Sequence, residues 1–454
     1  MNYDAVVIGS GVGGYSTAIS LSNRERSVAI IEEHLVGGEC VNYGCVPTKA
    51  FYHFSEALRI LKKINSEAYW NWKDLVKWVN ELVSDTRSNL IHLLEKKGVE
   101  IIHGRALLKD HKHIRIGDFE VSTNAVVLAT GTDPKSLKNL VFDNKQVLSN
   151  RDVLKLEEKP SSILIVGGGV IGIEFANIFS NLGINIKIVE ALDHILPFID
   201  QDVALSIKKY MVEKGVEIYE KTYVENVSKI GDELSVKLSN GESFKVDHVF
   251  VAVGREPKTR GIGLENTGVE LDNAGFIKVG DGYETSAKDI YAVGDVTGPP
   301  LLAHKAIIEG ILASKSIVGI KVGKLDSHLI PQTIFSGLEV AFIGYTEKEL
   351  IEKKIGFKKY KLPIYYLSAV RIKDSKYSFV KILVNEHDPN VIHGVQIVSP
   401  NASEVISSFI PILMGRIALS EAATTPYPHL TVSETVREIA EFVLGESIHV
   451  VIKK

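Results

Sequence analysis

Cysteine is nearly absent from this chain: Cys40 and Cys45 are the only two among 454 residues. They lie in the stretch GGECVNYGCVPTK, residues 37–49. A structural disulfide is unexpected in a reducing compartment, whereas a transient redox disulfide is common there. Two cysteines alone cannot complete a tetrahedral zinc site. A redox dithiol is therefore the first interpretation of the pair, a metal site the second, and two inert buried thiols the third.

The chain also lacks a strong charge of either sign and any long apolar run. A net charge of -4 gives no electrostatic case for binding nucleic acid or an anionic membrane. The most apolar segment, residues 163–179, is interrupted by glycines and Glu174, and it is too short to span a bilayer. Met1 leads almost directly into the apolar run AVVIG without the pattern of a secretory signal. We therefore expect a cytoplasmic protein with no membrane segment.

One unit occurs twice in the sequence. An apolar strand runs into Gly9-x-Gly11-x-x-Gly14, a helical pattern follows, and the next strand ends in Glu32. The same order recurs at Gly167-x-Gly169-x-x-Gly172, with Glu190 as its acid. Each acid lies eighteen residues past the third glycine (14 to 32 and 172 to 190). A strand, a glycine turn, a helix and an acid at the end of the next strand are typical of a dinucleotide-binding unit.

The pattern predicts an α/β protein with two Rossmann-like domains and a C-terminal α+β domain. A 454-residue chain is too long for one core. A third apolar strand, IYAVGD, ends at Gly294-Asp295 and indicates a return of the chain to the first domain. We expect the first dinucleotide domain over residues 1–145, the second over 146–270, the return over 271–330 and the C-terminal domain over 331–454.

These motifs together resemble the FAD-dependent pyridine nucleotide–disulfide oxidoreductases. The most specific element is GGECVNYGCVPTK, close to the GG-x-C-x-N-x-G-C-x-P-[ST]-K of that family. The resemblance covers essentially the whole chain. It is strongest to the branch of the family that oxidises dihydrolipoyl groups. It implies a C-terminal domain that forms a homodimer.

The resemblance implies that the first domain binds FAD and the second NAD. The implied FAD-binding residues are Gly9, Gly11, Gly14, Glu32, Lys49, Ala106, Thr130, Gly131, Asp295 and Ala303. The implied NAD-binding residues are Gly167, Gly169, Gly172, Glu190, Val224 and Gly254. A carboxylate such as Glu190 at the ribose hydroxyls suits NAD and repels a 2′-phosphate. The following run VEALDHILP contains no arginine, unlike NADP-dependent relatives.

The resemblance also assigns catalytic roles. Cys45 would be the thiolate beside the flavin, and Cys40 the thiol that exchanges with substrate. A helix starting near Pro47 would help to lower a thiolate pKa through its N-terminal field. Lys49 would lie beside the flavin ring and pair with Glu174. No metal is implied.

A C-terminal histidine is the candidate base. His429 precedes Glu434 by five residues, similar to the family's H-P-T-x-S-E pattern. There the histidine takes a proton from the substrate dithiol and the glutamate orients its ring. Thr431-x-x-Glu434 also fits a helix capping box, and both roles are compatible. In the homodimer, the partner's His429 would complete each site.

Four positions depart from the family pattern. Glu39 replaces a threonine beside the first cysteine, and a carboxylate there can raise the pKa of Cys40. Tyr427 stands where many members have a histidine, and Leu430 replaces a proline. The segment SGLEVA, residues 336–341, replaces T-x-P-E-V-A. These departures bear on the substrate rather than on the class of reaction.

The leading hypothesis is an NAD-dependent enzyme that oxidises dihydrolipoyl groups through a Cys40–Cys45 disulfide and FAD. Its partners would be dihydrolipoamide or the lipoyl domain of a 2-oxoacid dehydrogenase or glycine cleavage complex. The alternative is an NADH-dependent reductase of another low-molecular-weight disulfide. A flavoprotein without enzyme activity is a third hypothesis, disfavoured because both cysteines, Lys49 and His429 are present.

Overall fold

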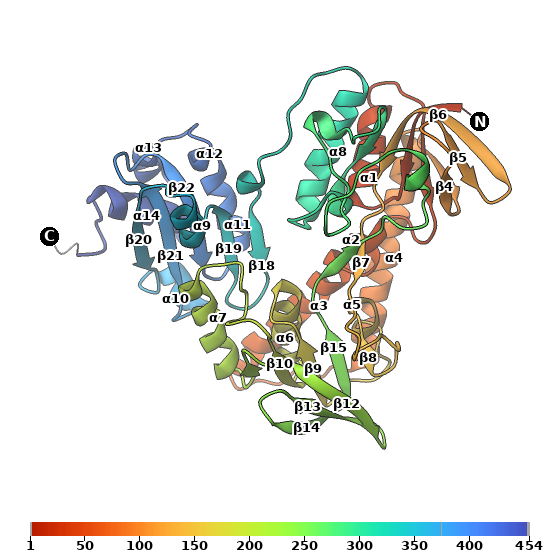
Figure 1. Ribbon diagram of the computed structural model, residues 1–454. Coiled ribbons are helices and arrows are strands. Elements are labelled where there is room, and N and C mark those ends of the chain that lie inside the picture. Colours follow the sequence, from red (N-terminus) through yellow and green to blue (C-terminus); the bar gives the residue numbers. More distant parts are fainter. Residues whose placement is uncertain (1, 374, 452–454) are drawn as a thin grey trace.

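The computed structural model describes residues 2–373 and 375–451. It contains three main sheets, one at each corner of the molecule in Figure 1. Two of them have a parallel core of strands and the third is antiparallel. The predicted α/β class is confirmed. Among the described residues, no helix is both long enough and apolar enough to cross a membrane.

The first sheet has the strand order β3-β2-β1-β6-β5-β4, with β17 paired to β6. Strands β1, β2, β3, β6 and β17 are parallel, because helices connect most of them. Alternate residues of β1 enter separate cores on the two faces, which explains its unbroken apolar run. The elements are β1 (Asn2–Ile8), α1 (Val12–Ser22), β2 (Val28–Glu32), β3 (Glu100–His103), β4 (Ala106–Leu108), β5 (His113–Ile116), β6 (Phe119–Leu128), β17 (Ile290–Ala292), the 3-10 helix η3 (Gly294–Thr297) and α8 (Ala303–Ile317).

The second sheet is fully parallel, with the order β11-β10-β9-β15-β8. A small antiparallel sheet, β12-β13-β14, and the pair β7–β16 accompany it. The elements are β7 (Thr132–Pro134), β8 (Val147–Leu148), α5 (Asn150–Val153), β9 (Ser162–Val166), α6 (Val170–Asn181), β10 (Asn185–Val189), α7 (Gln201–Glu213), β11 (Glu217–Tyr219), β12 (Val224–Ile230), β13 (Glu233–Leu238), β14 (Ser243–Val246), β15 (His248–Val251) and β16 (Arg255–Pro257).

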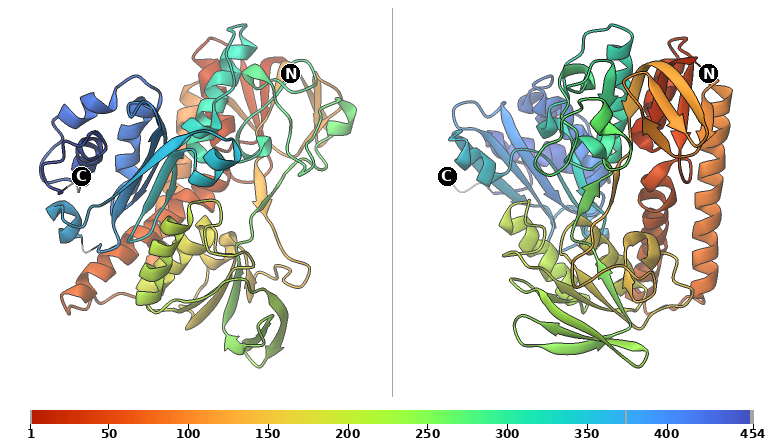
Figure 2. Two further views of the ribbon diagram at one scale, coloured as in Figure 1. Left: turned by 60° about the vertical axis from the view of Figure 1, so that its left-hand side comes forward. Right: turned by 45° about the vertical axis from the view of Figure 1, so that its right-hand side comes forward.

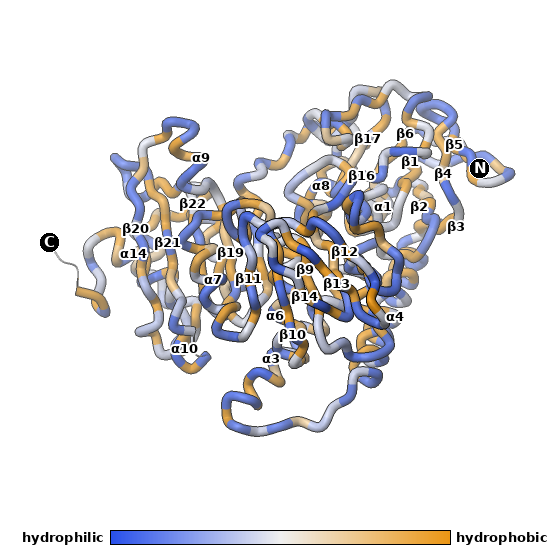
Figure 3. Tube along the Cα trace, turned by 60° about the horizontal axis from the view of Figure 1, so that its bottom comes forward, coloured by the Kyte–Doolittle hydropathy of each residue, from blue (hydrophilic) through white to orange (hydrophobic). Residues whose placement is uncertain are grey.

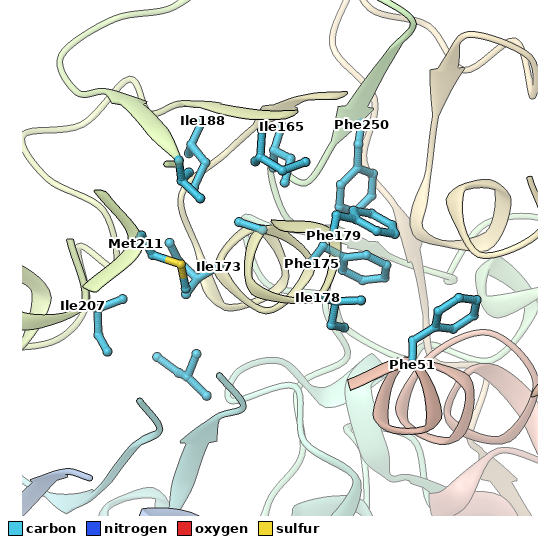
Figure 4. Close-up of a cluster of buried hydrophobic side chains, with 14 of the residues drawn as sticks. Phe51, Ile165, Ile173, Phe175, Ile178, Phe179, Ile188, Ile207, Met211 and Phe250 are labelled. Carbon is cyan, nitrogen blue, oxygen red and sulfur yellow. The ribbon is translucent and has the colours of Figure 1, made fainter. Parts of the chain in front are cut away.

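Between β2 and β3 the chain forms α2 (Gly38–Asn42), α3 (Cys45–Lys63) and α4 (Trp72–Lys96). Helix α3 leaves the first sheet and buries its apolar face in the core of the second, where Phe51 joins Ile178 and Phe179 of α6 (Figure 4). Helix α4 runs alongside α3 (Figure 2). The two dinucleotide-type units are therefore joined by the helix that begins at Cys45.

The C-terminal sheet is antiparallel, with the order β18-β19-β22-β21-β20. Strands β19, β21 and β22 are largely apolar (Figure 3), whereas the edge strand β20 carries three lysines. The elements are β18 (Gln332–Ile334), β19 (Val340–Gly344), α9 (Glu347–Glu352), β20 (Phe357–Pro363), α10 (Ser368–Ile372), β21 (Phe379–Asn385), β22 (Ile392–Val398), α11 (Ala402–Val405), α12 (Ile410–Leu413), α13 (Leu419–Thr424), the 3-10 helix η6 (Val432–Glu434) and α14 (Thr435–Leu444). Further 3-10 turns are η1 (Leu264–Asn266), η2 (Asp281–Tyr283), η4 (Ser327–Leu329) and η5 (Ile406–Phe409).

Candidate active site

The first glycine turn forms a cradle at the carboxyl end of β1. Gly9 has φ +97°, and a Cβ at Gly14 would overlap the carbonyl oxygen of Gly9. Glu32, at the end of β2, accepts hydrogen bonds from the Ser10 backbone N (2.9 Å), the Ser10 hydroxyl (2.6 Å) and the His34 backbone N (2.8 Å). The acid thus fixes the turn and holds its own carboxylate at the edge of the cradle.

The second glycine turn repeats this geometry after β9. Gly167 has φ +110°, and a Cβ at Gly172 would overlap the carbonyl oxygen of Gly167. Glu190 accepts hydrogen bonds from the backbone N of Gly168 (2.7 Å) and of Leu192 (2.8 Å). Because backbone N–H groups at a helix N-terminus attract phosphate, each cradle is suited to a pyrophosphate.

Both thiols lie where helix α3 begins. The helix starts at Cys45 itself, two residues earlier than the predicted start near Pro47. The hydrogen bond from Cys40 and the Lys49 charge hold the pKa of Cys45 below its usual range, although burial opposes them. The shared proton and burial together raise the pKa of Cys40. These directions favour Cys45 over Cys40 as the thiol that ionises first.

An ion pair lies one helical turn from the dithiol. Lys49 Nζ is 2.7 Å from Glu174 Oε2, so α3 is tied to α6. Glu174 Oε1 accepts a hydrogen bond from the Phe335 backbone N (3.0 Å), and Lys49 Nζ lies 4.3 Å from the centre of the Phe335 ring. All three sheets thus contribute to this contact. Phe335 carries no sequence motif, so nothing in the sequence points to it.

A partly buried carboxylate, that of Asp295, faces the same space from η3. Thr132 Oγ1 donates to Asp295 Oδ2 (3.0 Å), and Arg255 Nε donates to Thr132 Oγ1 (2.7 Å). Burial raises the pKa of Asp295, although the Thr132 hydrogen bond opposes it. Sequence reasoning missed Thr132 and Arg255, although both adjoin the predicted turns at Gly131 and Gly254.

The dithiol, the first cradle and Asp295 all face one cavity of about 1200 Å³. Cys40, Cys45 and Glu174 line it. Most residues that the sequence predicts for FAD also line it: Gly9, Gly11, Glu32, Lys49, Ala106, Thr130, Gly131, Asp295 and Ala303. The residues predicted for NAD gather instead around the second turn and do not line this cavity: Gly167, Gly169, Gly172, Glu190, Val224 and Gly254.

His429 lies apart from the dithiol of its own chain. Its Nδ1 is 3.0 Å from Glu434 Oε1, as the histidine–glutamate spacing predicts. Glu434 Oε2 also accepts a hydrogen bond from the Thr431 backbone N (3.3 Å), as in a capping box. The His429 side chain is 78% exposed and does not line the cavity. Leu430 is exposed, and Tyr427 packs against the C-terminal core.

Glu39 is paired with cationic side chains from other elements, and its expected effect on the pKa of Cys40 stays a prediction. Burial alone would raise the pKa of Glu39, but Arg255, Arg151 and Asn150 together lower it, so the carboxylate is charged and fully paired. The cationic partners of Glu39 offset the negative charge that would otherwise repel a Cys40 thiolate. No motif in the sequence places Asn150 and Arg151, more than a hundred residues away, beside Glu39.

The fold and site thus define an oxidoreductase with two dinucleotide-type cradles and a dithiol. The chain belongs to the pyridine nucleotide–disulphide oxidoreductase family, whose model matches residues 3–310, and the dimerisation domain of that family matches residues 330–440. A dihydrolipoyl dehydrogenase of Thermus scotoductus is 33% identical, with 99% of each chain covered. One from Geobacillus stearothermophilus is also 33% identical, covering 99% of this chain and 98% of that protein.

Two solved structures share the fold. LpdA from Mycobacterium tuberculosis has a TM-score of 0.90 at 26% identity, covering 97% of this chain and 99% of its own. The HOCl-induced flavoprotein disulfide reductase RclA from Escherichia coli has a TM-score of 0.87 at 25% identity, covering 97% of this chain and all of its own (100%). The match to the dimerisation domain indicates a homodimer.

Proposed function

We propose that the chain is a dihydrolipoamide dehydrogenase that uses FAD and NAD⁺. The observation that carries this proposal is the dithiol at the N-terminus of α3, which faces the same cavity as the first dinucleotide cradle. Relatives of similar length named dihydrolipoyl dehydrogenase support the choice of substrate. We assign FAD to residues 1–145 and 271–330, NAD to 146–270 and the dimer contact to 331–454.

The cavity fits FAD. The Gly9 turn and Glu32 would hold its pyrophosphate and adenosine ribose, and partly buried Asp295 would bind the ribityl chain at the other end. Lys49 would lie beside the ring, with its charge held by Glu174. When bound, FAD supplies the two-electron link between the dithiol and NAD⁺.

The two thiols divide the exchange between them. One thiolate of the dihydrolipoyl group attacks Cys40 of the Cys40–Cys45 disulfide, and Cys45 leaves as a thiolate. The second substrate thiol then attacks the mixed disulfide and passes its proton to Cys40 as Cys40 leaves. The substrate is thereby oxidised to its cyclic disulfide, and the enzyme holds a Cys45 thiolate and a Cys40 thiol, with the other substrate proton on the base. The low pKa of Cys45 makes it the better leaving group, and the higher pKa of Cys40 suits it to carry the proton.

A base must take the proton from the substrate, and we assign this role to the partner subunit's His429. Within one chain, His429 is exposed and outside the cavity. Glu434 fixes the ring through Nδ1, which leaves Nε2 to accept the proton. Hybrid dimers test this assignment. A mixture of His429→Gln and Cys45→Ser subunits should form dimers in which one site is intact. This mixture should regain activity that neither variant has alone.

Glu190 would hold the ribose hydroxyls of NAD and exclude a 2′-phosphate. Its carboxylate is fixed at the second turn by Gly168 and Leu192. Gly167, Gly169 and Gly172 would bind the pyrophosphate, and Val224 and Gly254 would lie near the adenine and nicotinamide ends. The physiological partner would be the lipoyl domain of a 2-oxoacid dehydrogenase or glycine cleavage complex in the cytoplasm.

A second candidate is an NADH-dependent reductase of another small disulfide. The likeness to a flavoprotein disulfide reductase favours it, as do Tyr427 and Leu430 next to the proposed base. The two candidates are separated by mixing the holoenzyme anaerobically with dihydrolipoamide and NAD⁺ while recording flavin absorbance and NADH. We expect prompt NADH and a long-wavelength band from a thiolate beside flavin. That band with NADH, but no turnover of dihydrolipoamide, would contradict the first candidate and favour the second.

A further inference from the structure

Glu39, the residue before Cys40, is held by two neighbouring elements. Its Oε1 accepts a hydrogen bond from Asn150 Nδ2 (2.8 Å) and lies 3.3 Å from Arg255 Nη2. Its Oε2 accepts hydrogen bonds from Arg151 Nε (3.0 Å) and Nη2 (2.6 Å). Both carboxylate oxygens of Glu39 are therefore paired with side chains of α5 and β16, which lie outside the helices α2 and α3 that carry the cysteines.

Helix α5 also contacts Tyr43, at the other end of the segment between the cysteines. Asn150 Nδ2 donates to the Tyr43 carbonyl oxygen (3.1 Å). The Arg151 guanidinium lies 5.3 Å and Lys155 Nζ 4.8 Å from the centre of the Tyr43 ring. Residues Asn150 and Arg151 thus hold the dithiol turn, residues 39–44, at both of its ends.

Glu39 belongs to a wider network of charges. Arg151 Nη2 also contacts Asp133 Oδ1 (2.7 Å), and Lys258 Nζ lies 3.0 Å from the same oxygen. Asp295 of η3 interacts electrostatically with both Arg255 and Glu39, so three carboxylates face the three cations Arg151, Arg255 and Lys258. Removing one member leaves an opposite charge partly buried and without its partner, which changes the local potential at the dithiol.

We propose that Glu39 is a positioning residue for the dithiol, clamped by Arg151 and Arg255 so that it fixes the turn that carries Cys40 without raising the thiols' proton affinity. The threonine that the family places at this position has no charge to clamp. The inference rests on the proposed redox role of the two cysteines.

Other charged groups face the thiols directly and stay unchanged in the test. Lys49 lies on α3, its partner Glu174 on α6, and Tyr15 on α1. Burial and the two thiols raise the pKa of Tyr15. Because these groups are common to every variant below, a change in the thiols' titration follows from the Glu39 clamp alone.

Loss of Arg151 and loss of Glu39 should shift the pH at which the thiols ionise in opposite directions. Arg151→Gln frees part of the Glu39 charge, which should raise the pH at which the thiols ionise by about half a unit. Glu39→Gln leaves two guanidinium groups without their carboxylate and should lower that pH by about the same amount. In the double variant Glu39→Gln/Arg151→Gln, the pH should return close to the wild-type value.

The measurement uses the FAD-loaded dimer, reduced anaerobically either by NADH or by dithiothreitol that is then removed. The rate of iodoacetamide alkylation at Cys40 and at Cys45 is followed from pH 5 to pH 10 by mass spectrometry. Lys155→Gln is the matched control, because Lys155 contacts the Tyr43 ring without contacting Glu39. We expect it to leave the profile within about 0.2 units of wild type, because its charge is not tied to the carboxylate.

The clamp is overturned if both single variants shift the profile in the same direction, if neither shifts it, or if Lys155→Gln shifts it as far as Arg151→Gln does. Failure of the proposed redox role of the two cysteines gives a different result. In that case dithiothreitol exposes two thiols but NADH does not, while the alkylation profiles of the variants still test the clamp.

Discussion

Two lysines tie the second dinucleotide unit to its neighbours, and they do so in opposite environments. Lys49 reaches Glu174 of α6 from α3, faces the cavity and keeps 35% of its side chain exposed. Lys381, on β21 of the C-terminal sheet, has no exposed side chain (0%) and contacts three carboxylates around α7 and α9. The Lys49 contact lies at the proposed active site. The Lys381 contact is buried between the second dinucleotide unit and the C-terminal sheet.

The carboxylates around Lys381 are close enough together to hold a metal ion. Asp200, Asp202 and Glu347 offer oxygens within 4.8 Å of one another. Lys381 Nζ lies 2.7 Å, 2.7 Å and 2.9 Å from them, so an ammonium group occupies the position of a cation. Gln396 adds a hydrogen bond to Asp200. We expect the Lys49–Glu174 pair at the cavity to affect reactivity, and the buried Lys381 cluster to hold α7 against the C-terminal sheet.

The largest effect should come from breaking the buried cluster. Lys381→Met removes the buried cation from the cluster and takes away the ion-pair partner of buried Asp200, which should cost about 3–5 kcal/mol of unfolding free energy. Asp202 and Glu347 keep their contacts with Lys361 and Lys359. Guanidinium unfolding of the holoenzyme, followed by circular dichroism, measures the change. The rate of flavin reduction by NADH in the protein that remains folded should stay within about twofold of wild type, since the cluster does not line the cavity.

Lys361→Met is the matched control. Lys361 contacts the same Asp202 (2.7 Å), but 37% of its side chain is exposed. Its loss should cost less than about 1 kcal/mol. Equal losses of stability in the two variants would show that burial does not distinguish these contacts.

The next effect should appear in reactivity without a loss of stability. Lys49→Met removes a cation beside the proposed flavin site and should slow flavin reduction by NADH by about 100-fold, measured by stopped-flow absorbance. Unfolding free energy should change by about 1 kcal/mol or less, because Lys49 is partly exposed and Glu174 faces the cavity.

Glu174→Gln tests whether the pair or the lysine alone matters. The amide keeps the shape and can still accept from the Phe335 backbone N. We expect a rate between those of wild type and Lys49→Met, with normal FAD content. A wild-type rate in both variants would contradict the proposed role of this pair.

The same contrast separates what the sequence could predict from what it could not. Lys49 and Glu174 stand at fixed positions in two recognisable motifs, so their pairing was predictable, as were the glycine turns and the α/β class. Lys381 lies in the apolar run FVKILV, where it resembles the one polar residue of a half-exposed strand. Its three partners come from α7 and α9, and only tertiary packing brings them together. The ion pairs of Glu39 could not be predicted for the same reason, because Arg151 and Arg255 lie far along the chain.

The smallest predicted effect is a pH dependence of stability at the Lys381 cluster. Burial would raise the pKa of Asp202, but hydrogen bonds from Lys361 and Lys381 outweigh it and hold the pKa below its ordinary value of 3.8. A carboxyl with a lowered folded-state pKa stabilises the protein above its unfolded pKa, and this contribution is lost as pH falls through the folded value. Asp202→Asn should therefore be less stable than wild type by about 1 kcal/mol at pH 7, since the Asp202 side chain is 31% exposed.

That difference should begin to narrow as the pH falls below about 4 and should close below the folded pKa, where wild-type Asp202 also becomes neutral. Guanidinium midpoints of the two proteins from pH 3 to pH 7 measure the narrowing. A difference that stays constant across this range would mean that Asp202 contributes through its shape and hydrogen bonds rather than its charge. In that case the Lys381 cluster would hold the sheets together through Asp200 and Glu347, and the contrast with Lys49 would rest on burial alone.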